Sequence, residues 1–374
     1  MFLNLHMIQT FPASNLNRDD TGAPKDVIFG GHKRSRISSQ CQKRSIRTHP
    51  SFRRRIEESG GDLGVRTARL TERLQEIFQN AGRPDEEIEK TIEAILKAIG
   101  IKKASKSEKT QYLLFLGNKE IEELADIALD HWQEAVKDSK KPEFEKTTEK
   151  QMKTILSERA KKSGYAADIA LFGRMMADDK NLNVDAACQV AHAVGTSANS
   201  LQTDFYTAVD DLLPEDESGA GMMGIIEFTS ATYYRYADID LNKLSENLGE
   251  LHSDQAVAAV TGFVEAAIKA IPTGMQNSFA AHTPPKYIRL ELTEAPLSLA
   301  NAFEKPIPVR KDRSVERSSI EALKEEARRT EEFLGSGPKW MLEADFYDSQ
   351  TLCVPALIEE LQKRLAAYFS PEES

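Results

Sequence analysis

Cysteine is scarce in this 374-residue chain, which contains only Cys41, Cys188 and Cys353. The three lie far apart, which argues against a disulfide framework and a zinc knuckle. Long apolar runs are also absent, because polar and charged residues interrupt even the cleanest stretch, 256–271. The N-terminus carries neither a basic region nor a small-residue cleavage site. We therefore expect no signal peptide, no membrane association and a cytoplasmic location.

Several motifs that would indicate a cofactor-binding site are absent from the sequence. The seven histidines show no ligand-like pair and no cysteine partner at metal-binding spacing. There is no glycine-rich lysine loop for nucleotide phosphates and no nucleophile elbow around a serine. The aromatic signature of common RNA-stacking sheets is absent too. We expect no metal ion and no other cofactor.

Charge is distributed unevenly along the chain. The net charge is −10, yet residues 25–55 hold ten Lys and Arg and a single acid, Asp26. The other 343 residues hold 39 basic and 58 acidic side chains. One basic segment on an acidic protein indicates either a solvated basic face or a place where a polyanion binds.

A helix is predicted in this segment, beginning at Ser38 or Ser39 as N-cap and running to about Glu57. Its polar residues recur at helical spacing and make one stripe: Arg36, Gln40, Lys43 and Arg47. Apolar and small residues make the neighbouring face. One side can pack while the other presents cations.

The remaining pattern predicts strands on either side of a helical block. Strands are expected at 2–9, 167–174, 187–194, 225–236 and 287–293, and helices at 67–80, 85–99, 118–137, 144–162, 254–271, 319–334 and 355–369. The stretch 214–224 reads as a hairpin tip or a flexible loop. This order predicts an α+β fold, a ferredoxin-like or RNA-recognition-type sheet with a large helical insertion.

Catalytic interpretations of nearby residues are weighed against simpler ones. Asp19, Asp20 and Asp26 are candidate magnesium ligands, but loop anchoring is the better interpretation because no further acids lie close by. His6 or His32 is a candidate general base for metal-free RNA cleavage. A histidine in a strand is more often packed, and His32 can serve as a phosphate contact.

Binding explains the basic segment better than catalysis does. Lysine and arginine on one helix face, beside the turn at Gly30 and Gly31, can follow a phosphate backbone without reading sequence. Phe205, Tyr206 and Met175 are candidates to stack on bases, although spacing alone favours an ordinary core role for them.

A family resemblance rests on collinear segments between residues 4 and 305. They are 17–20 (NRDD), 25–31 (KDVIFGG), 34–44 (RSRISSQCQKR), 172–175 (FGRM), 191–193 (AHA), 205–211 (FYTAVDD), 234–237 (YRYA) and 296–305 (PLSLANAFEK). In these segments the chain resembles the CasC family, the CRISPR RNA-binding backbone subunit of the type I-E Cascade surveillance complex.

The resemblance implies a hand-shaped, non-catalytic protein. Its discontinuous palm would comprise 1–60 and 165–374, its helical fingers 61–164, and its β-hairpin thumb 193–227. Copies would stack head to tail along a CRISPR RNA, beside other Cascade subunits, and present the spacer for pairing with target DNA.

Site residues follow by position from the same resemblance. The RNA-binding set would be Arg18, Lys25, Ser38, Gln40, Lys43, Arg44, Met175, Phe205, Tyr206, Thr207, Lys305 and Lys311. Of these, Phe205, Tyr206, Thr207 and Met175 would displace a base at regular intervals. Related backbone subunits cleave target RNA with a loop aspartate and a metal ion, and Asp26 or Asp19 would take that role in the alternative function.

Overall fold

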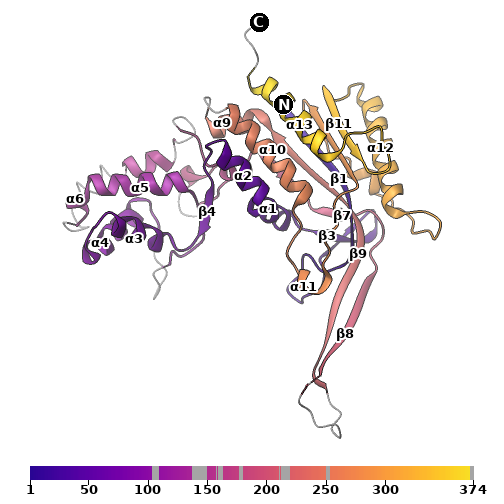
Figure 1. Ribbon diagram of the computed structural model, residues 1–374, viewed down its shortest axis with the longest axis horizontal. Helices are drawn as coiled ribbons and strands as arrows, with labels where there is room; N and C mark the ends of the chain where they lie inside the picture. The colour runs from indigo at the N-terminus through magenta and orange to yellow at the C-terminus, as the bar shows by residue number, and fades with distance from the viewer. Residues whose placement is uncertain are drawn as a thin grey trace. The chain divides into compact units, whose positions relative to one another are not determined.

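The computed structural model describes residues 1–102, 109–136, 150–156, 158, 163–176, 180–209, 211, 220–249 and 253–370. The chain divides into two compact units (Figure 1). The first comprises 1–50, 189–239 and 263–363, and the second comprises 51–188, 240–262 and 364–374. The predicted helical insertion, 61–164, falls inside the second unit. The finer division into palm, fingers and thumb stays a prediction.

A largely antiparallel sheet organises the first unit. Its main path runs β11-β10-β1-β9-β7-β3-β2, and β6 and β8 also pair with β9. The strands are β1 (Phe2–Ser14), β2 (Asp26–Phe29), β3 (His32–Ile37), β6 (Cys188–Val190), β7 (Ala193–Gly195), β8 (Leu201–Val209), β9 (Ala220–Asp240), β10 (Tyr287–Thr293) and β11 (Trp340–Asp345).

The helical connections confirm the predicted fold class. Helix α1 (Ser39–Thr48) lies in the chain between β1 and β7, and α10 (Ser253–Lys269) lies between β9 and β10. The four strands that these helices connect lie in the order β10-β1-β9-β7. That is the fourth, first, third and second strand of a βαββαβ unit, as in a ferredoxin-like sheet. The protein is therefore α+β, as predicted.

The C-terminal half of β9 is buried on both faces of the sheet. Tyr234 and Tyr236 of β9 pack with residues of η2 (Ala300–Phe303) and α12 (Val315–Leu334) on one face. Tyr233 points the other way and packs with Phe11 and Ile37, against which Cys41 of α1 also rests. Alternation along β9 accounts for the two separate clusters. The short α11 (Gln276–Phe279) also belongs to the first unit, and α13 (Val354–Phe369) begins in it.

The second unit is mainly helical. Its elements are α2 (Pro50–Glu58), β4 (Gly64–Thr67), α3 (Leu70–Asn80), α4 (Asp85–Ala98), β5 (Leu114–Gly117), α5 (Asn118–Asp130), α6 (Trp132–Val136), α8 (Ala167–Phe172), η1 (Lys180–Leu182) and α9 (Leu241–Leu248). Helices α3 to α6 enclose an apolar core that includes Leu74, Phe78 and Trp132. Arg174 and Glu120 form an ion pair of 2.9 Å inside this unit, and both are buried.

Several sequence predictions need correction. The helix expected from Ser38 to about Glu57 is two helices, because His49 takes an extended conformation before Pro50. Arg36 precedes the helix and lies on β3, so it does not belong to the predicted helical stripe. The strand expected at 167–174 is α8, since a short apolar run suits either element. The strand at 187–194 is two short strands, β6 and β7, and the helix at 118–137 divides into α5 and α6.

Two other predictions fall largely outside the described residues. Of the helix predicted at 144–162, only residues 150–156 and 158 are described, and they are helical. The predicted loop at 214–224 is described from residue 220 onward, where it belongs to β9. Among the helices the structure describes, none is long and apolar enough to cross a membrane.

Candidate nucleic-acid interface

Helix α1 is anchored by its buried face. Ser38 is its N-cap, and the Ser38 hydroxyl accepts a hydrogen bond from the Cys41 amide at 3.3 Å. Gln42 is buried and donates to the Ala191 carbonyl at 2.8 Å, which ties the helix to the sheet. The opposite side of the helix leaves Gln40 and Arg44 exposed.

Lys43 is half-buried beside these two exposed residues. The four predicted residues of α1 therefore divide into a structural cap, Ser38, and the three polar side chains on the outer face, Gln40, Lys43 and Arg44.

The loop before β2 is fastened to the start of α1. Asn17 accepts from the Ser38 amide at 2.8 Å through its side chain and from the Lys25 amide at 2.9 Å through its carbonyl. Arg18 pairs with Pro24 in an isolated β-bridge, and its side chain is exposed. The structure thus brings Arg18 and Lys25 to the N-terminal end of α1.

Asp19 stabilises this loop through hydrogen bonds to its side chain. Its carboxylate accepts from the Thr21 hydroxyl at 2.7 Å, the Thr21 amide at 2.9 Å and the Ala23 amide at 3.0 Å. These bonds, the hydroxyl bond first, lower the pKa of the Asp19 carboxyl. Asp26 instead pairs with Lys33 at 2.6 Å. Among the described residues, no group of three or more acidic, histidine or cysteine side chains is arranged to hold a metal ion.

The role of Arg34 was not predicted from the sequence, where it is one of the ten basic residues of segment 25–55. Its side chain is fully buried, and its guanidinium donates to four carbonyl oxygens, those of Gly195, Thr196, Phe303 and Glu304, at 2.9 to 3.1 Å. It therefore joins the end of β7 to the loop after η2 and does not face solvent. A local sequence pattern cannot reveal contacts with residues so distant in the chain.

The loop after η2 carries the last two predicted cations. Gly30, at φ +58°, lies so close to this loop that a β-carbon there would come within 1.7 Å of the Glu304 carbonyl oxygen. The contact places Lys305, the next residue, beside the β2–β3 turn. Lys311 lies in a turn between Arg310 and Arg313, which form an isolated bridge. Both lysines are exposed.

The hairpin of β8 and the N-terminal part of β9 projects from the sheet as a two-stranded arm (Figure 1). Phe205 pairs with Ile225 and Thr207 with Met223, so these four side chains share one face. Phe205, Met223 and Ile225 are 62%, 67% and 69% exposed. Apolar side chains so exposed on a narrow arm are typical of a contact surface.

Tyr206 lies on the opposite face of the arm. It pairs with Gly224, where a β-carbon would come within 2.4 Å of the tyrosine ring. The ring therefore rests on the glycine, and Tyr206 is less exposed than Phe205, at 38%. Part of its role is to stabilise the arm.

Met175 belongs to the second unit. It follows the buried Arg174 and is 87% exposed. A methionine left this open is available for a contact with a base or a partner, and the core role weighed for it does not apply. Phe205 is also exposed, so the core role weighed for it does not apply either.

The two candidate histidines differ in exposure. His6 is fully buried, with Nδ1 2.9 Å from the Tyr234 hydroxyl and Nε2 3.6 Å from Glu291. Burial lowers the pKa of His6, because it disfavours the charged form of the ring. A fully buried ring does not reach a substrate at the surface. His32 is exposed at the β2–β3 turn.

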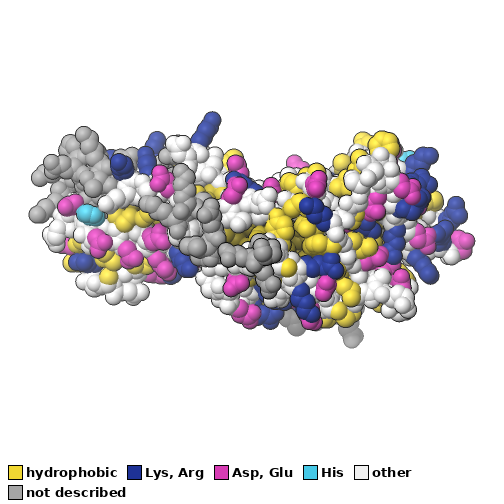
Figure 2. Space-filling view, turned by 90° about the horizontal axis from the view of Figure 1, so that it is seen from above, with side chains coloured by type: hydrophobic (Ala, Val, Ile, Leu, Met, Phe, Trp, Pro, Cys, Tyr) yellow, Lys and Arg dark blue, Asp and Glu magenta, His cyan; other side chains and the backbone are white. Residues whose placement is uncertain are grey.

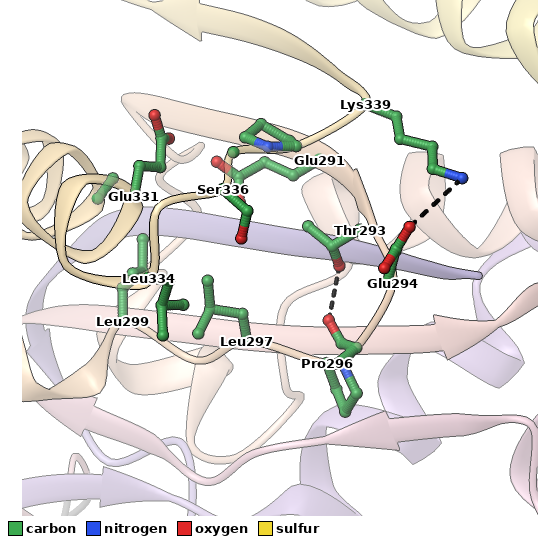
Figure 3. Close-up of a pocket in the computed structure, with 14 residues that line it drawn as sticks. Glu291, Thr293, Glu294, Pro296, Leu297, Leu299, Glu331, Leu334, Ser336 and Lys339 are labelled. Atoms are coloured by element: carbon green, nitrogen blue, oxygen red, sulfur yellow. Dashed lines mark hydrogen bonds and ion pairs between the residues drawn. The ribbon is translucent and has the colours of Figure 1, made fainter.

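A pocket of about 280 Å³ lies at the C-terminal end of α12 (Figure 3). Leu297, Leu299 and Leu334 give it apolar walls, and Glu291 and Glu331 line it as well. Arg289 pairs with both carboxylates. None of the predicted RNA-binding residues lines it. Apolar walls and carboxylates are a poor setting for a phosphate, so the pocket is not part of the proposed interface.

The cations of α12 are arranged differently from those of α1. Arg328 pairs with Glu325 and Glu332, and Arg329 pairs with Glu325. Figure 2 shows blue and magenta side chains intermixed at the right of the view, where α12 lies. Such a surface is close to neutral over short distances, so it is a weaker candidate for binding a polyanion than a face of unpaired cations.

Comparisons with known proteins agree with this fold. One solved structure, "CRISPR RNA-guided surveillance complex, pre-nicking", contains a chain with a TM-score of 0.81 and 29% identity, covering 98% of this chain and 100% of that chain. Another, "CRISPR RNA-guided surveillance complex", contains a chain with a TM-score of 0.70 and 25% identity, covering 97% and 100%. No curated protein matches the sequence. The model of the CT1975-like protein family matches residues 3–363, and the chain therefore belongs to that family.

Proposed function

We propose that this protein is the CRISPR RNA-binding backbone subunit of a type I-E Cascade complex. The observation that carries the proposal is similarity over nearly the whole chain to subunits of RNA-guided surveillance complexes. Copies bind head to tail along the guide RNA in the cytoplasm, alongside other Cascade subunits. They present the spacer for pairing with target DNA and do not themselves cleave nucleic acid.

The charge arrangement supports this role. A protein that must present any spacer cannot depend on base identity, so phosphate contacts by lysine and arginine are the expected chemistry. Arg18, Lys25, Lys43, Arg44 and Lys305 supply such contacts from the α1 face and the two loops fastened around it. The acidic remainder of the protein discourages nucleic acid from coating other surfaces.

The projecting arm supports the proposal that the protein presents the spacer in short, separately paired segments. Phe205 and Thr207 share one of its faces, where they displace a base of the bound RNA at regular intervals. Met175, which is exposed as well, also contacts the RNA in this proposal. Pairing interrupted in this way lets a duplex form in short segments without winding continuously around the guide. In this proposal residues 1–60 and 165–374 are the palm, residues 61–164 are the fingers and 193–227 are the thumb.

The test uses purified full-length protein and end-labelled single-stranded RNA of increasing length, in magnesium or in EDTA. The expected result is a ladder of shifted bands that grows with RNA length on native gels, with intact RNA on denaturing gels. Cleavage that requires magnesium and disappears in Asp26→Asn or Asp19→Asn would replace the proposal with a target-RNA nuclease. Cleavage in EDTA would point to a histidine base such as His32.

Salt dependence tests the placement of the interface. Lys43→Ala combined with Arg44→Ala should weaken binding to all RNA sequences alike and lower the salt slope by about 0.7 for each lost phosphate contact. Arg328→Ala combined with Arg329→Ala removes two positive charges from the ion-paired surface of α12 and is the matched control. An equal loss in both variants would show that only total charge matters.

A further inference from the structure

The side chains of Arg36 and His192 contact each other, and neither residue belongs to the predicted RNA-binding set. Arg36 Nη1 lies 2.8 Å from His192 Nδ1, and Arg36 Nε donates to the Asp26 carbonyl at 2.9 Å. Arginine has only donors, so His192 Nδ1 must be the acceptor in this contact. The ring is therefore neutral here, with its proton on Nε2, and the guanidinium is held on two sides in one orientation.

The surroundings of this pair are cationic. Burial, and then the charges of Arg36 on β3 and Lys25 before β2, lower the pKa of His192. Lys25 and Arg44 also act on the Cys41 thiol of α1. The charged groups that act on His192 from the neighbouring elements are thus both cations, and the same cluster extends to α1.

This cluster lacks compensating carboxylates in the described part of the chain. Neighbouring cations of the basic segment do have ion-pair partners, as Lys33 has Asp26 and Arg53 has Glu57. Lys25, Arg36 and Arg44 have none there. Like charges gathered without a counter-charge repel one another in the free protein. An anionic ligand relieves that repulsion.

We propose that Arg36 and His192 form a phosphate subsite on the RNA path beside Lys25, and that His192 takes up a proton as the phosphate binds. The inference rests on the proposed function, since the ligand is the RNA backbone. The proton comes from solvent and enters at Nδ1, which breaks the Arg36–His192 hydrogen bond. The freed guanidinium hydrogens and the imidazolium then both donate to phosphate oxygens.

The sign of the pH effect follows from the two states. In the free protein the neighbouring cations favour neutral His192, whereas a bound phosphate favours the imidazolium and raises its pKa. Binding therefore takes up a proton in the interval between the two pKa values. RNA affinity rises as pH falls through that interval and levels off below the pKa of the free protein.

The experiment measures binding of a short fluorescent oligouridylate to the full chain at about pH 8 and about pH 6, on either side of the ordinary histidine pKa. The wild-type protein should gain several-fold more affinity on acidification than His192→Gln, and the two should agree within about twofold at the higher pH. Arg36→Gln should weaken binding at both pH values and lower the salt slope by about 0.7.

His282→Gln is the matched control, because His282 is an exposed histidine of the same unit outside this cluster. It should keep the wild-type pH dependence. Histidine-selective NMR provides a readout that a structural role alone would not move. The pKa of His192 should rise when oligouridylate saturates the protein, and it should also be higher in free Arg36→Gln than in the free wild type.

The outcomes separate the inference from the proposed function. If oligouridylate binds but His192→Gln retains the full pH dependence, or the pKa of His192 does not move on binding, the subsite is overturned and the RNA-binding role stands. If the wild-type protein binds no RNA under any condition, the proposed function fails and the subsite fails with it.

Discussion

Arg34 donates to the carbonyl oxygen of Glu304 at 3.0 Å across 270 residues of chain. Burial lowers the pKa of the Arg34 guanidinium, which donates its hydrogen bonds to four carbonyl oxygens. Its charge is solvated by the protein backbone instead of by water. Because Lys305 follows Glu304, a buried arginine fixes the position of an exposed lysine of the proposed interface.

Replacing Arg34 should therefore cost substantial stability. Arg34→Met leaves four carbonyl oxygens without their donor, and we expect the free energy of unfolding in urea to fall by at least about 3 kcal/mol. Arg34→Lys should recover only part of the loss, because one ammonium cannot reproduce the guanidinium fork. Arg53→Met, at an exposed ion pair of 3.9 Å, should cost less than about 1 kcal/mol. Equal costs for Arg34→Met and Arg53→Met would contradict this role.

Gly30 and Gly31 allow a matched comparison at the β2–β3 turn. Both have positive φ, +58° and +75°, so alanine at either position carries the cost of a left-handed conformation, about 1–2 kcal/mol. Only Gly30 has a close neighbour, the Glu304 carbonyl, whereas a β-carbon at Gly31 meets open space. Gly30→Ala should therefore be clearly less stable in urea than Gly31→Ala, and it should weaken RNA binding by displacing Lys305. If the two variants behave alike, the contact with Glu304 does not matter.

The sequence predicted the regular elements better than the contacts between them. Strand β10 and helix α10 carry long, unambiguous patterns, and the structure confirms both. Arg34 and Arg36 illustrate what sequence could not predict. They lie two residues apart on β3, where alternation places them on the same side, yet only Arg34 is fully buried. The difference arises because residues 303–304 cover Arg34, a contact that no local pattern encodes.

The candidate site residues also divide into those that local sequence patterns predict and those that only the structure reveals. Ser38 as an N-cap and the outward face of α1 follow from helix periodicity and capping, which are local properties. The gathering of Lys25, Arg36 and His192 depends on how β2, β3 and β7 pair, and His192 alone in a sequence carries no such signal. Exposure of Phe205 and Met175 likewise required the structure, because an apolar residue is more often buried.

His6 makes folding sensitive to acid. Its pKa is lowered chiefly by burial, so the unfolded chain binds a proton more readily than the native protein does. The stability that neutral His6 contributes is present above the ordinary histidine pKa and is lost as pH falls below it. Between the unfolded and the native pKa the slope from this one group approaches about 1.4 kcal/mol per pH unit.

The measurement is the urea midpoint between about pH 7.5 and about pH 5.5. His6→Gln should lower stability overall but flatten this pH dependence, since the titrating group is gone. His282→Gln, at an exposed position, should leave the slope unchanged. His49 and His192, whose pKa values are also lowered by burial, should retain part of the slope in His6→Gln. A wild-type slope in His6→Gln would show that the buried ring does not control acid stability.

Phe205 should matter to the arrangement of bound RNA and not to folding. Its side chain is 62% exposed, so Phe205→Ala should change the free energy of unfolding by less than about 0.5 kcal/mol. In the assembled filament, chemical probing of the bases should show a changed spacing of protected positions, with a smaller effect on affinity. Tyr206→Ala is the informative comparison, because its ring rests on Gly224 and its loss should loosen the arm itself. If the protection pattern in Phe205→Ala equals that of the wild type, the exposed face of the arm does not displace a base, and Phe205 serves a protein contact instead.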